Sequence, residues 1–352
     1  MREVTQLQGK LLGKIEHVPQ EAGNASALDA QLQNIIQSSA IEGEHLNAES
    51  VRSSLVKRLG VKDAGLSSAT AQTEGLADLL LDATQNYKQA LSLDRLFQWH
   101  TCLFPEQNSN DFSLQTIKVG QLRGDELMQV VSGPHQKRTV HFQAPPRDGL
   151  EEELNVFLAW LNTSRDDKTL DPILRAAQAH LWFVTLHPFD DGNGRLAGAV
   201  SDYALAQGEQ QSIRYYAMAA SIMENRKAYY EILERTQKSD MDITAWMNWF
   251  LATLRHTLEA ALVRIDMILR KSRFWQLHGQ DGLKPEQTKV LNRLLDAGPD
   301  GFEGGLTAGK YQRMAKVSKA TATRHITDLL EKQCICKLEG GGRSTHYEIN
   351  WP

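Results

Sequence analysis

The sequence is poor in cysteine. Its 352 residues include only Cys102, Cys334 and Cys336. Three thiols, two of them separated by a single residue, make neither a disulfide framework nor a zinc-binding set. We therefore expect a protein kept in a reducing compartment, which indicates the cytoplasm.

Long apolar runs are missing too. No segment approaches the length that spans a bilayer. Residues 1–18 mix charged and apolar side chains, without the uninterrupted apolar core of a signal peptide. We expect neither secretion nor a membrane partner.

The sequence also lacks a strong charge of either sign. It has 39 basic and 43 acidic residues, a net charge of −4, and an ordinary hydrophobic content of 41%. Local patches decide nucleic-acid binding, so this balance does not exclude it. The length indicates two or three domains with ample material for a core.

Helical periodicity dominates the chain. Leu28, Leu32 and Ile35 recur at the spacing of one helix face. Similar patterns predict nine helices before residue 271, at 28–39, 48–58, 68–90, 93–102, 149–162, 171–186, 195–206, 224–237 and 242–270. The fold is predicted to be mainly α.

One β-hairpin interrupts this pattern. Residues 128–131 and 139–143 are β-prone, and residues 132–135 between them are rich in turn formers. Pro145 and Pro146 end the second strand, because proline cannot continue a ladder. A hairpin alone cannot build a sheet core, so it either binds a partner or is simply a surface hairpin.

The C-terminal segment has a different character. Helices at 286–297, 307–315 and 318–331 precede strands at 334–338 and 345–350. This order is typical of a winged helix-turn-helix. Charged residues between 304 and 327 are all basic: Lys310, Arg313, Lys316, Lys319 and Arg324. The module therefore binds DNA or, alternatively, serves protein binding or dimerisation.

Residues 187–195 read HPFDDGNGR and follow a predicted helix. A second helix would begin in this stretch, and a helix N-terminus attracts anions. Asn193 and Arg195 add side-chain donors, and Asp191 could hold Mg²⁺ beside phosphate oxygens. His187 could accept a proton near neutral pH. The segment predicts a nucleotide-phosphate site with its own general base.

These nine consecutive residues resemble the signature of the Fic family, H-P-F-x-D/E-G-N-G-R-x-x-R. The resemblance implies transfer of AMP from ATP, with Mg²⁺, to a hydroxyl of a target protein. It also implies a mainly α, Fic-type helical bundle with a hairpin flap and a C-terminal winged helix-turn-helix. The expected parts are an N-terminal helical region with an inhibitory motif (1–95), a Fic core (96–270), a linker (271–283) and a winged helix domain (284–352).

The resemblance assigns roles to particular residues. His187 is the catalytic base and Asp191 the metal ligand, while Phe189 anchors the loop and Asp190 is expected to be solvated. The nucleotide-binding set is Gly192, Asn193, Gly194, Arg195, Tyr229, Tyr230 and Gln237. The flap, which pairs with the target protein, comprises Val140, His141, Phe142 and Gln143. One of the two tyrosines is expected to pack the helix against the core.

Ser38-Ser39-Ala40-Ile41-Glu42-Gly43 resembles the inhibitory motif of the family, S/T-x-x-x-E-G/N. The resemblance implies that Ser38, Glu42 and Gly43 form an N-terminal inhibitory element, with Glu42 near the phosphate site. In the family this glutamate pairs with the second arginine of the signature. The alternative is that Glu42 and Glu44 are exposed carboxylates at a helix end.

One position departs from the signature. The second arginine should fall at 198, where this chain has Gly198. Loss of that guanidinium should weaken ATP binding and also remove the expected partner of Glu42. We expect the first effect to dominate catalysis.

Other readings remain open. The protein could remove AMP, transfer another phosphate-containing group, or be a DNA-binding regulator with a degenerate nucleotide site. Gly198 favours the last reading, whereas His187 and Asp191 oppose it. The sequence does not identify the target, and it leaves a homodimer open.

Overall fold

The computed structural model of the protein describes residues 1–59, 68–105, 117–132, 139–212, 214–297, 301–338 and 345–351. The chain divides into two compact units. The first comprises Met1–Leu7 and Asn24–Glu259, and the second comprises Gln8–Gly23 and Ala260–Pro352.

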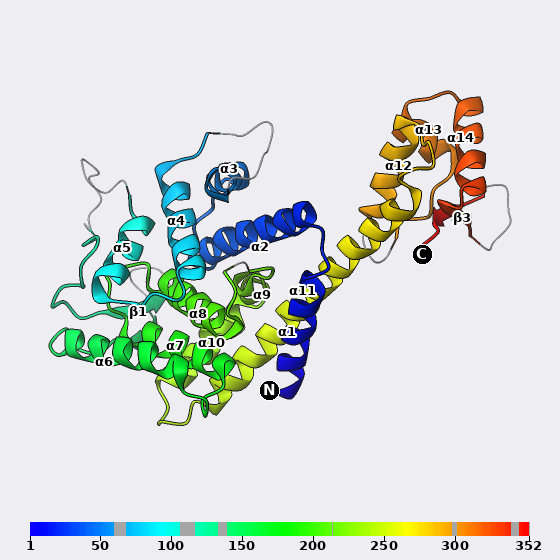
Figure 1. Cartoon of the computed structure of the whole chain (residues 1–352). Helices are drawn as coiled ribbons and strands as arrows, with labels where there is room; N and C mark the ends of the chain where they lie inside the picture. Colours follow the sequence, from blue (N-terminus) through cyan, green and yellow to red (C-terminus); the bar gives the residue numbers. More distant parts are fainter. Residues whose placement is uncertain are drawn as a thin grey trace. The chain divides into compact units, whose positions relative to one another are not determined.

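Three helices have residues in both units, namely α1 (Arg2–Ile15), α2 (Gln20–Ile41) and α11 (Thr244–His278). The other helices of the first unit are α3 (Ala48–Leu59), α4 (Ala71–Gln85), α5 (Leu93–Leu103), α6 (Leu150–Thr163), α7 (Pro172–Leu186), α8 (Asn193–Glu209), α9 (Met218–Glu224) and α10 (Arg226–Gln237), with a 3₁₀ turn η2 (Ser164–Asp166). Figure 1 shows these helices in chain order.

The prediction of a mainly α fold with a small hairpin is confirmed. Each of the nine segments predicted to be helical before residue 271 contains a helix, although 68–90 is helical only over α4, and α1 and α9 were not predicted. Helix α11 also continues to His278, so residues 271–278 of the expected linker are helical. The other domain boundaries stay predictions.

Helices α7 and α8 are neighbours in the first unit (Figure 1). Asp171 starts α7 by accepting the backbone N–H of Ile173 at 2.8 Å, and Pro172 follows at the first helical position. Apolar side chains of both helices, including Phe183 and Val200, are fully buried. This packing fixes the end of α7 and the start of α8, which flank the signature loop.

The hairpin consists of β1 (Gln129–Ser132) and β2 (Thr139–Gln143), paired antiparallel. Its described part is a two-stranded sheet. The buried Phe142 side chain packs inward, whereas Val131 and Val140 are exposed. The predicted turn at residues 133–135 lies outside the described residues.

The second unit contains α12 (Pro285–Leu295), α13 (Ala308–Ala315), α14 (Lys319–Glu331) and the antiparallel pair β3 (Ile335–Lys337) and β4 (Tyr347–Ile349). The elements follow the predicted order around one apolar cluster that includes Phe274, Leu291 and Leu329. Among the five basic residues of the predicted face, Lys310 is bonded to backbone carbonyls and the other four are exposed.

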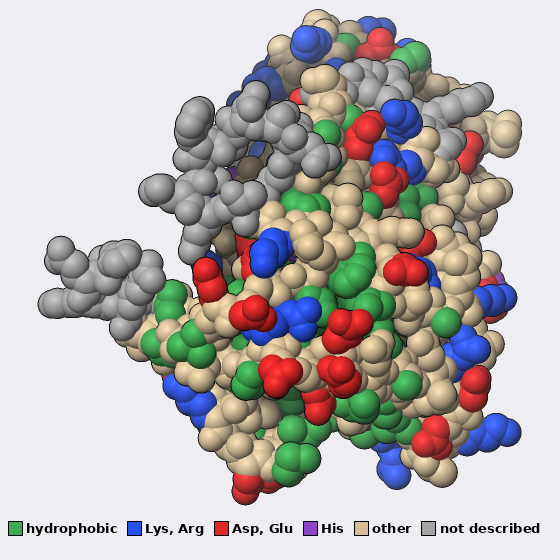
Figure 2. All heavy atoms as spheres, turned by 90° about the vertical axis from the view of Figure 1, so that its left-hand side faces the viewer, with side chains coloured by type: hydrophobic (Ala, Val, Ile, Leu, Met, Phe, Trp, Pro, Cys, Tyr) green, Lys and Arg blue, Asp and Glu red, His purple; other side chains and the backbone are tan. Residues whose placement is uncertain are grey.

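On the face drawn in Figure 2, acidic and basic side chains of the described residues are interspersed. Among the described helices, none combines the length and apolar character needed to cross a membrane.

Candidate active site

The loop between α7 and α8 depends on two residues with left-handed backbone. His187 ends α7 with φ 49° and ψ 56°, and Gly192 precedes α8 with φ 80°. A Cβ on Gly192 would lie 2.7 Å from Leu103 Cδ1, so glycine is required there. Gly192 also has no side chain to cap α8, which leaves the N–H groups of the first helical turn able to bind an anion.

Asn193 closes this loop. Its amide oxygen accepts the backbone N–H of Phe189 at 3.0 Å, and its amide nitrogen donates to the Phe189 carbonyl at 2.8 Å. One N–H of the Asn193 amide is thus used within the loop. Its second N–H and the backbone at the start of α8 are the groups it can offer an anion.

The buried side chain of His100 packs against the signature loop. The His100 ring stacks on Phe189 with centroids 4.1 Å apart, and Phe189 is fully buried, as expected of an anchor. His100 Nδ1 accepts the Gly120 N–H at 2.9 Å, which leaves Nε2–H to donate to the Asp191 carbonyl at 3.2 Å. Burial lowers the pKa of His100 and favours this neutral form.

Arg123 connects the loop to the end of the hairpin. Its Nε donates to the His187 carbonyl at 2.9 Å, and its Nη2 donates to the Pro145 carbonyl at 2.6 Å. The Arg123 backbone N–H donates to the Pro188 carbonyl at 3.0 Å. The side chain is buried, so these bonds hold the two segments in one geometry.

His187 is oriented as a proton acceptor. Its Nδ1 lies 3.2 Å from the Val184 carbonyl, which requires the proton on Nδ1 and leaves the Nε2 lone pair available. Burial lowers the pKa of His187 to about 4, and the nearby Arg123 charge acts in the same direction. The imidazole is therefore neutral at neutral pH.

Several predicted residues meet in one cavity of about 640 Å³. They come from the turn after α2, the hairpin, α7, α8 and α10: Glu42, His141, Phe142, His187, Gly194, Tyr229, Tyr230 and Gln237. The cavity is large enough for a nucleotide-sized ligand.

The two tyrosines have different surroundings. Tyr229 is buried, bonds His180 Nε2 at 3.0 Å and packs on Trp249. Tyr230 donates its hydroxyl to the Ile41 carbonyl at 3.0 Å, and Gln237 donates to Thr185 at 3.2 Å. Tyr229 therefore packs against the core, while Tyr230 contacts the predicted inhibitory segment.

The flap is attached to α10 by His141, whose Nδ1 lies 2.6 Å from Glu234 Oε2. Its neighbours Val140 and Gln143 are exposed and do not line the cavity. Asp190, predicted to be solvated, is partly exposed, and its carboxylate accepts the Lys118 backbone N–H at 3.0 Å.

Glu42 lies directly over the start of α8. A Cβ built on Gly194 would come within 1.9 Å of Glu42 Oε1, so the carboxylate fills the space above that glycine. Partial loss of solvent raises the pKa of Glu42, and the charge of Arg195 opposes this shift. Ser38 bonds within its own helix, and Gly43 turns the chain with φ 88°.

Arg195 pairs with Glu44 rather than Glu42. Its Nη1 lies 2.7 Å from Glu44 Oε2, and its Nη2 lies 3.9 Å from Asp191 Oδ2. Only 3% of the Arg195 side chain is exposed. The sequence indicated Glu42 as the inhibitory carboxylate but gave no sign that Glu44 binds this arginine.

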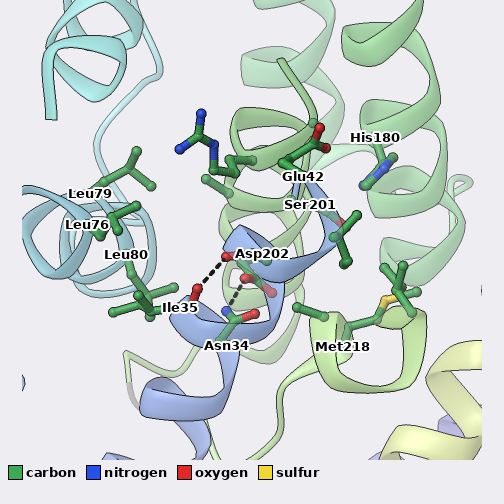
Figure 3. Close-up of a pocket in the computed structure, with 18 of the residues that line it drawn as sticks. Asn34, Ile35, Glu42, Leu76, Leu79, Leu80, His180, Ser201, Asp202 and Met218 are labelled. Carbon is green, nitrogen blue, oxygen red and sulfur yellow. Dashed lines mark hydrogen bonds between the residues drawn. The ribbon is translucent and has the colours of Figure 1, made fainter. Parts of the chain in front are cut away.

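Gly198 is one of the residues that line a second cavity, of about 70 Å³. A Cβ at this position would meet no atom within 4 Å. Figure 3 shows Asn34, Ser201 and Asp202 on one side of this cavity and leucines of α4 on another. Asn34 donates to Asp202 at 2.7 Å, so that carboxylate is already bonded.

The residues present fit a magnesium ion. Asp191 exposes 52% of its side chain; its Oδ1 accepts the neighbouring Gly192 N–H at 2.6 Å, and its Oδ2 lies 3.9 Å from Arg195 Nη2. Magnesium prefers one or two carboxylates together with phosphate oxygens and water. Asp191 can supply that carboxylate at the edge of the anion-binding turn.

Together, these observations describe a helical protein in which a loop before a helix N-terminus lies beside a hairpin. Residues 90–205 match the family described as Fic/DOC, and residues 1–61 match a family described as a domain of unknown function, DUF4172. Residues 90–205 of the chain therefore form a Fic domain.

Relatives of known name agree with this assignment. A uridine 5′-monophosphate transferase of Xanthomonas campestris is 34% identical over 119 residues, which are 33% of this chain and 21% of the relative. A protein adenylyltransferase Fic of Nematostella vectensis is 25% identical over 66% of this chain and 49% of its own length. That of Aedes aegypti is 28% identical over 60% and 38%. The chain thus spans less than half the length of these relatives.

Solved structures share the fold. A Fic domain containing signaling protein from Bacteroides thetaiotaomicron has a TM-score of 0.56 at 18% identity, over 75% of this chain and 97% of its own. A Fic family protein from Desulfovibrio desulfuricans has a TM-score of 0.55 at 17% identity, over 99% and 96%.

Two glycines one turn apart on α8 should respond differently to alanine. Gly198→Ala should raise the free energy of unfolding by up to about 1 kcal/mol, because alanine favours a helix and meets no clash. Gly194→Ala must displace the Glu42 carboxylate, so it should gain clearly less. Chemical denaturation of both variants measures the difference. Equal gains in the free energy of unfolding would mean that the Glu42 carboxylate does not occupy the space next to Gly194.

Proposed function

We propose that the protein transfers AMP from ATP to a serine, threonine or tyrosine hydroxyl of a target protein. The observation that carries this proposal is the shared cavity of His187 and the start of α8. Transfer from a nucleotide to an alcohol requires a proton acceptor for the hydroxyl and donors that stabilise the phosphate charge, and this cavity offers both. Relatives named protein adenylyltransferases support the same reaction class.

In the proposed reaction the target oxygen bonds to the α-phosphorus as the bond to the β-phosphate oxygen breaks. Pyrophosphate leaves, and His187 Nε2 takes the hydroxyl proton. Such a base typically contributes about 10²–10⁴-fold. The first turn of α8 and Arg195 would stabilise the phosphate charge. Magnesium held at Asp191 would neutralise charge on the leaving pyrophosphate.

The flap would position the target. Strand β2 pairs on one side with β1, so its other edge offers backbone donors and acceptors within the described sheet. An extended segment of the target can add to this edge and present its hydroxyl to His187. Exposed Val140 and Val131 would contact its side chains.

Self-inhibition would come from the turn after α2. The Glu42 carboxylate occupies the space over Gly194 that phosphate oxygens would use, and like charges repel. Glu44 engages Arg195, and Tyr230 binds the Ile41 carbonyl. Productive binding of ATP would then require the end of α2 to withdraw.

The role of the C-terminal module, the oligomeric state, the location and the identity of the donor are also proposals. The α12–β4 module is proposed to be a winged helix, with DNA or protein as its ligand. A homodimer and a cytoplasmic location are expectations from the sequence. The relative named for uridine monophosphate transfer makes UTP the second donor to test.

The reaction class is tested in the Glu42→Gly variant, which lacks the proposed inhibitory carboxylate, by incubating it with Mg²⁺ and ATP or UTP and measuring its mass by mass spectrometry. We expect a gain of one AMP, and no gain in His187→Ala, because the attacking hydroxyl then has no base. A gain of UMP alone would mean that UTP, and not ATP, is the donor. A gain that survives in His187→Ala would refute the mechanism.

The departure at Gly198 is tested by restoring the arginine. Gly198→Arg combined with Glu42→Gly should give more self-modification with labelled ATP than Glu42→Gly alone, because a second guanidinium can bind phosphate. Equal labelling in the two variants would mean that the missing arginine does not limit transfer.

Removal of the Glu44 charge should have two opposite effects. Glu44→Gln should strengthen ATP binding by about tenfold, the equivalent of about 1.4 kcal/mol, because Arg195 becomes available to phosphate. The same change should lower the melting temperature, since a buried guanidinium loses its partner.

Calorimetric titration and thermal unfolding measure the two effects of Glu44→Gln. Glu49→Gln, at an exposed carboxylate in α3, is the matched control. Unchanged ATP affinity in Glu44→Gln would exclude competition between Glu44 and the nucleotide.

A further inference from the structure

The second unit contains a cluster of three different metal-ligating side chains, far in sequence from the signature loop. His278 is the last residue of α11, Asp281 lies in the turn that follows, and Cys334 directly precedes β3. Their ligand atoms all lie within 4.8 Å of one another. His278 Nδ1 and Asp281 Oδ2 are 2.7 Å apart.

The backbone around this cluster is well fixed. The Cys334 N–H donates to the Leu329 carbonyl at 2.9 Å, and the Asn350 N–H donates to the Cys334 carbonyl at 3.1 Å. The Asp281 N–H donates to the His278 carbonyl at 3.2 Å. The tertiary structure therefore brings the three side chains together before any ion binds, which lowers the ordering cost of binding.

The surroundings limit access of water. Cys334 is fully buried, and the ring of Phe274 lies 4.6 Å from the His278 ring, centroid to centroid. His278 and Asp281 keep partial exposure, which leaves a path for an ion. Metal sites often have apolar residues around them, and these residues control the access of solvent.

Without a metal, these groups must share protons. A carboxylate and an imidazole nitrogen at 2.7 Å need a proton between them. Burial, together with the Asp281 charge, raises the pKa of Cys334 to about 11, so the thiol keeps its proton. A divalent cation would displace the thiol proton of Cys334 and bind the His278 Nδ1 lone pair, while the imidazole keeps its proton on Nε2.

We propose that His278, Asp281 and Cys334 form a binding site for a divalent transition-metal ion of the Zn²⁺ type. A thiolate, an imidazole and a carboxylate are the ligands zinc prefers, and three of them leave the fourth tetrahedral position to water. Thiolate and imidazole disfavour Mg²⁺ and Ca²⁺, which take oxygen ligands. The cysteine spacing alone gave no sign of this site, because its other ligands lie more than fifty residues away.

Binding would attach the end of α11 to the strand pair of the C-terminal module. Both the bound ion and the proton released by the Cys334 thiol are measurable without any enzymatic assay. The site is independent of the proposed transfer reaction, so either proposal can fail without the other.

The probe is Co²⁺ added to the full-length, reduced protein, followed by displacement with Zn²⁺. A thiolate ligand gives a sulfur-to-cobalt charge-transfer band, which a carboxylate site such as Asp191 cannot give. We expect about one equivalent per chain, with release of a proton and a higher melting temperature.

His278→Gln, Asp281→Asn and Cys334→Ser should each weaken Zn²⁺ binding by at least about tenfold, a loss that even outer-shell changes produce. Cys336→Ser, two residues along β3, and Asp191→Asn are controls and should keep the band. Circular dichroism checks that each variant is folded, and His278→Gln tests the site without altering the buried thiol.

Absence of the band in the wild-type protein would overturn the proposal. So would a band that His278→Gln and Asp281→Asn leave unchanged, or one that disappears in Cys336→Ser. An ion retained by Cys334→Ser with full affinity would likewise show that the site lies elsewhere.

Discussion

The double hydrogen bond between Asn193 and the backbone of Phe189 is the contact on which the candidate active site depends. It closes the loop after α7, and the stack of Phe189 on His100 holds the loop against α5. With the loop closed, the start of α8 faces the cavity and the imidazole of His187 lies at its edge. The signature residues thus serve the shape of the loop as much as its chemistry.

In the proposed mechanism, the nucleotide phosphates and the carboxylates after α2 would compete for the same turn of helix. A phosphate chain and the carboxylates after α2 are attracted by the same features, namely unpaired N–H groups and the guanidinium of Arg195. Glu44 makes the ion pair, while Glu42 stands over Gly194. Because this chain has Gly198 instead of a second arginine, Arg195 is the one signature cation for both Glu44 and the proposed nucleotide.

The sequence predicted what is local. The helices follow from apolar periodicity, and residues 187–195 predicted a loop before a helix because turn, cap and glycine lie in one stretch. It could not predict His100 and Arg123, whose bonds to the loop span 91 and 64 residues. Nor could it choose between Glu42 and Glu44, since the turn at Gly43 decides which carboxylate meets Arg195.

The bond from Tyr230 to the Ile41 carbonyl joins α10 to a segment of the same chain, not to a diffusing inhibitor. A tethered competitor has an effective concentration that dilution cannot lower. The apparent affinity for nucleotide would then depend on two quantities: the intrinsic affinity of the site and the stability of the contact that holds the inhibitory segment in place. If the proposed transfer takes place, a partner protein that binds the N-terminal helices would change the nucleotide concentration needed for it.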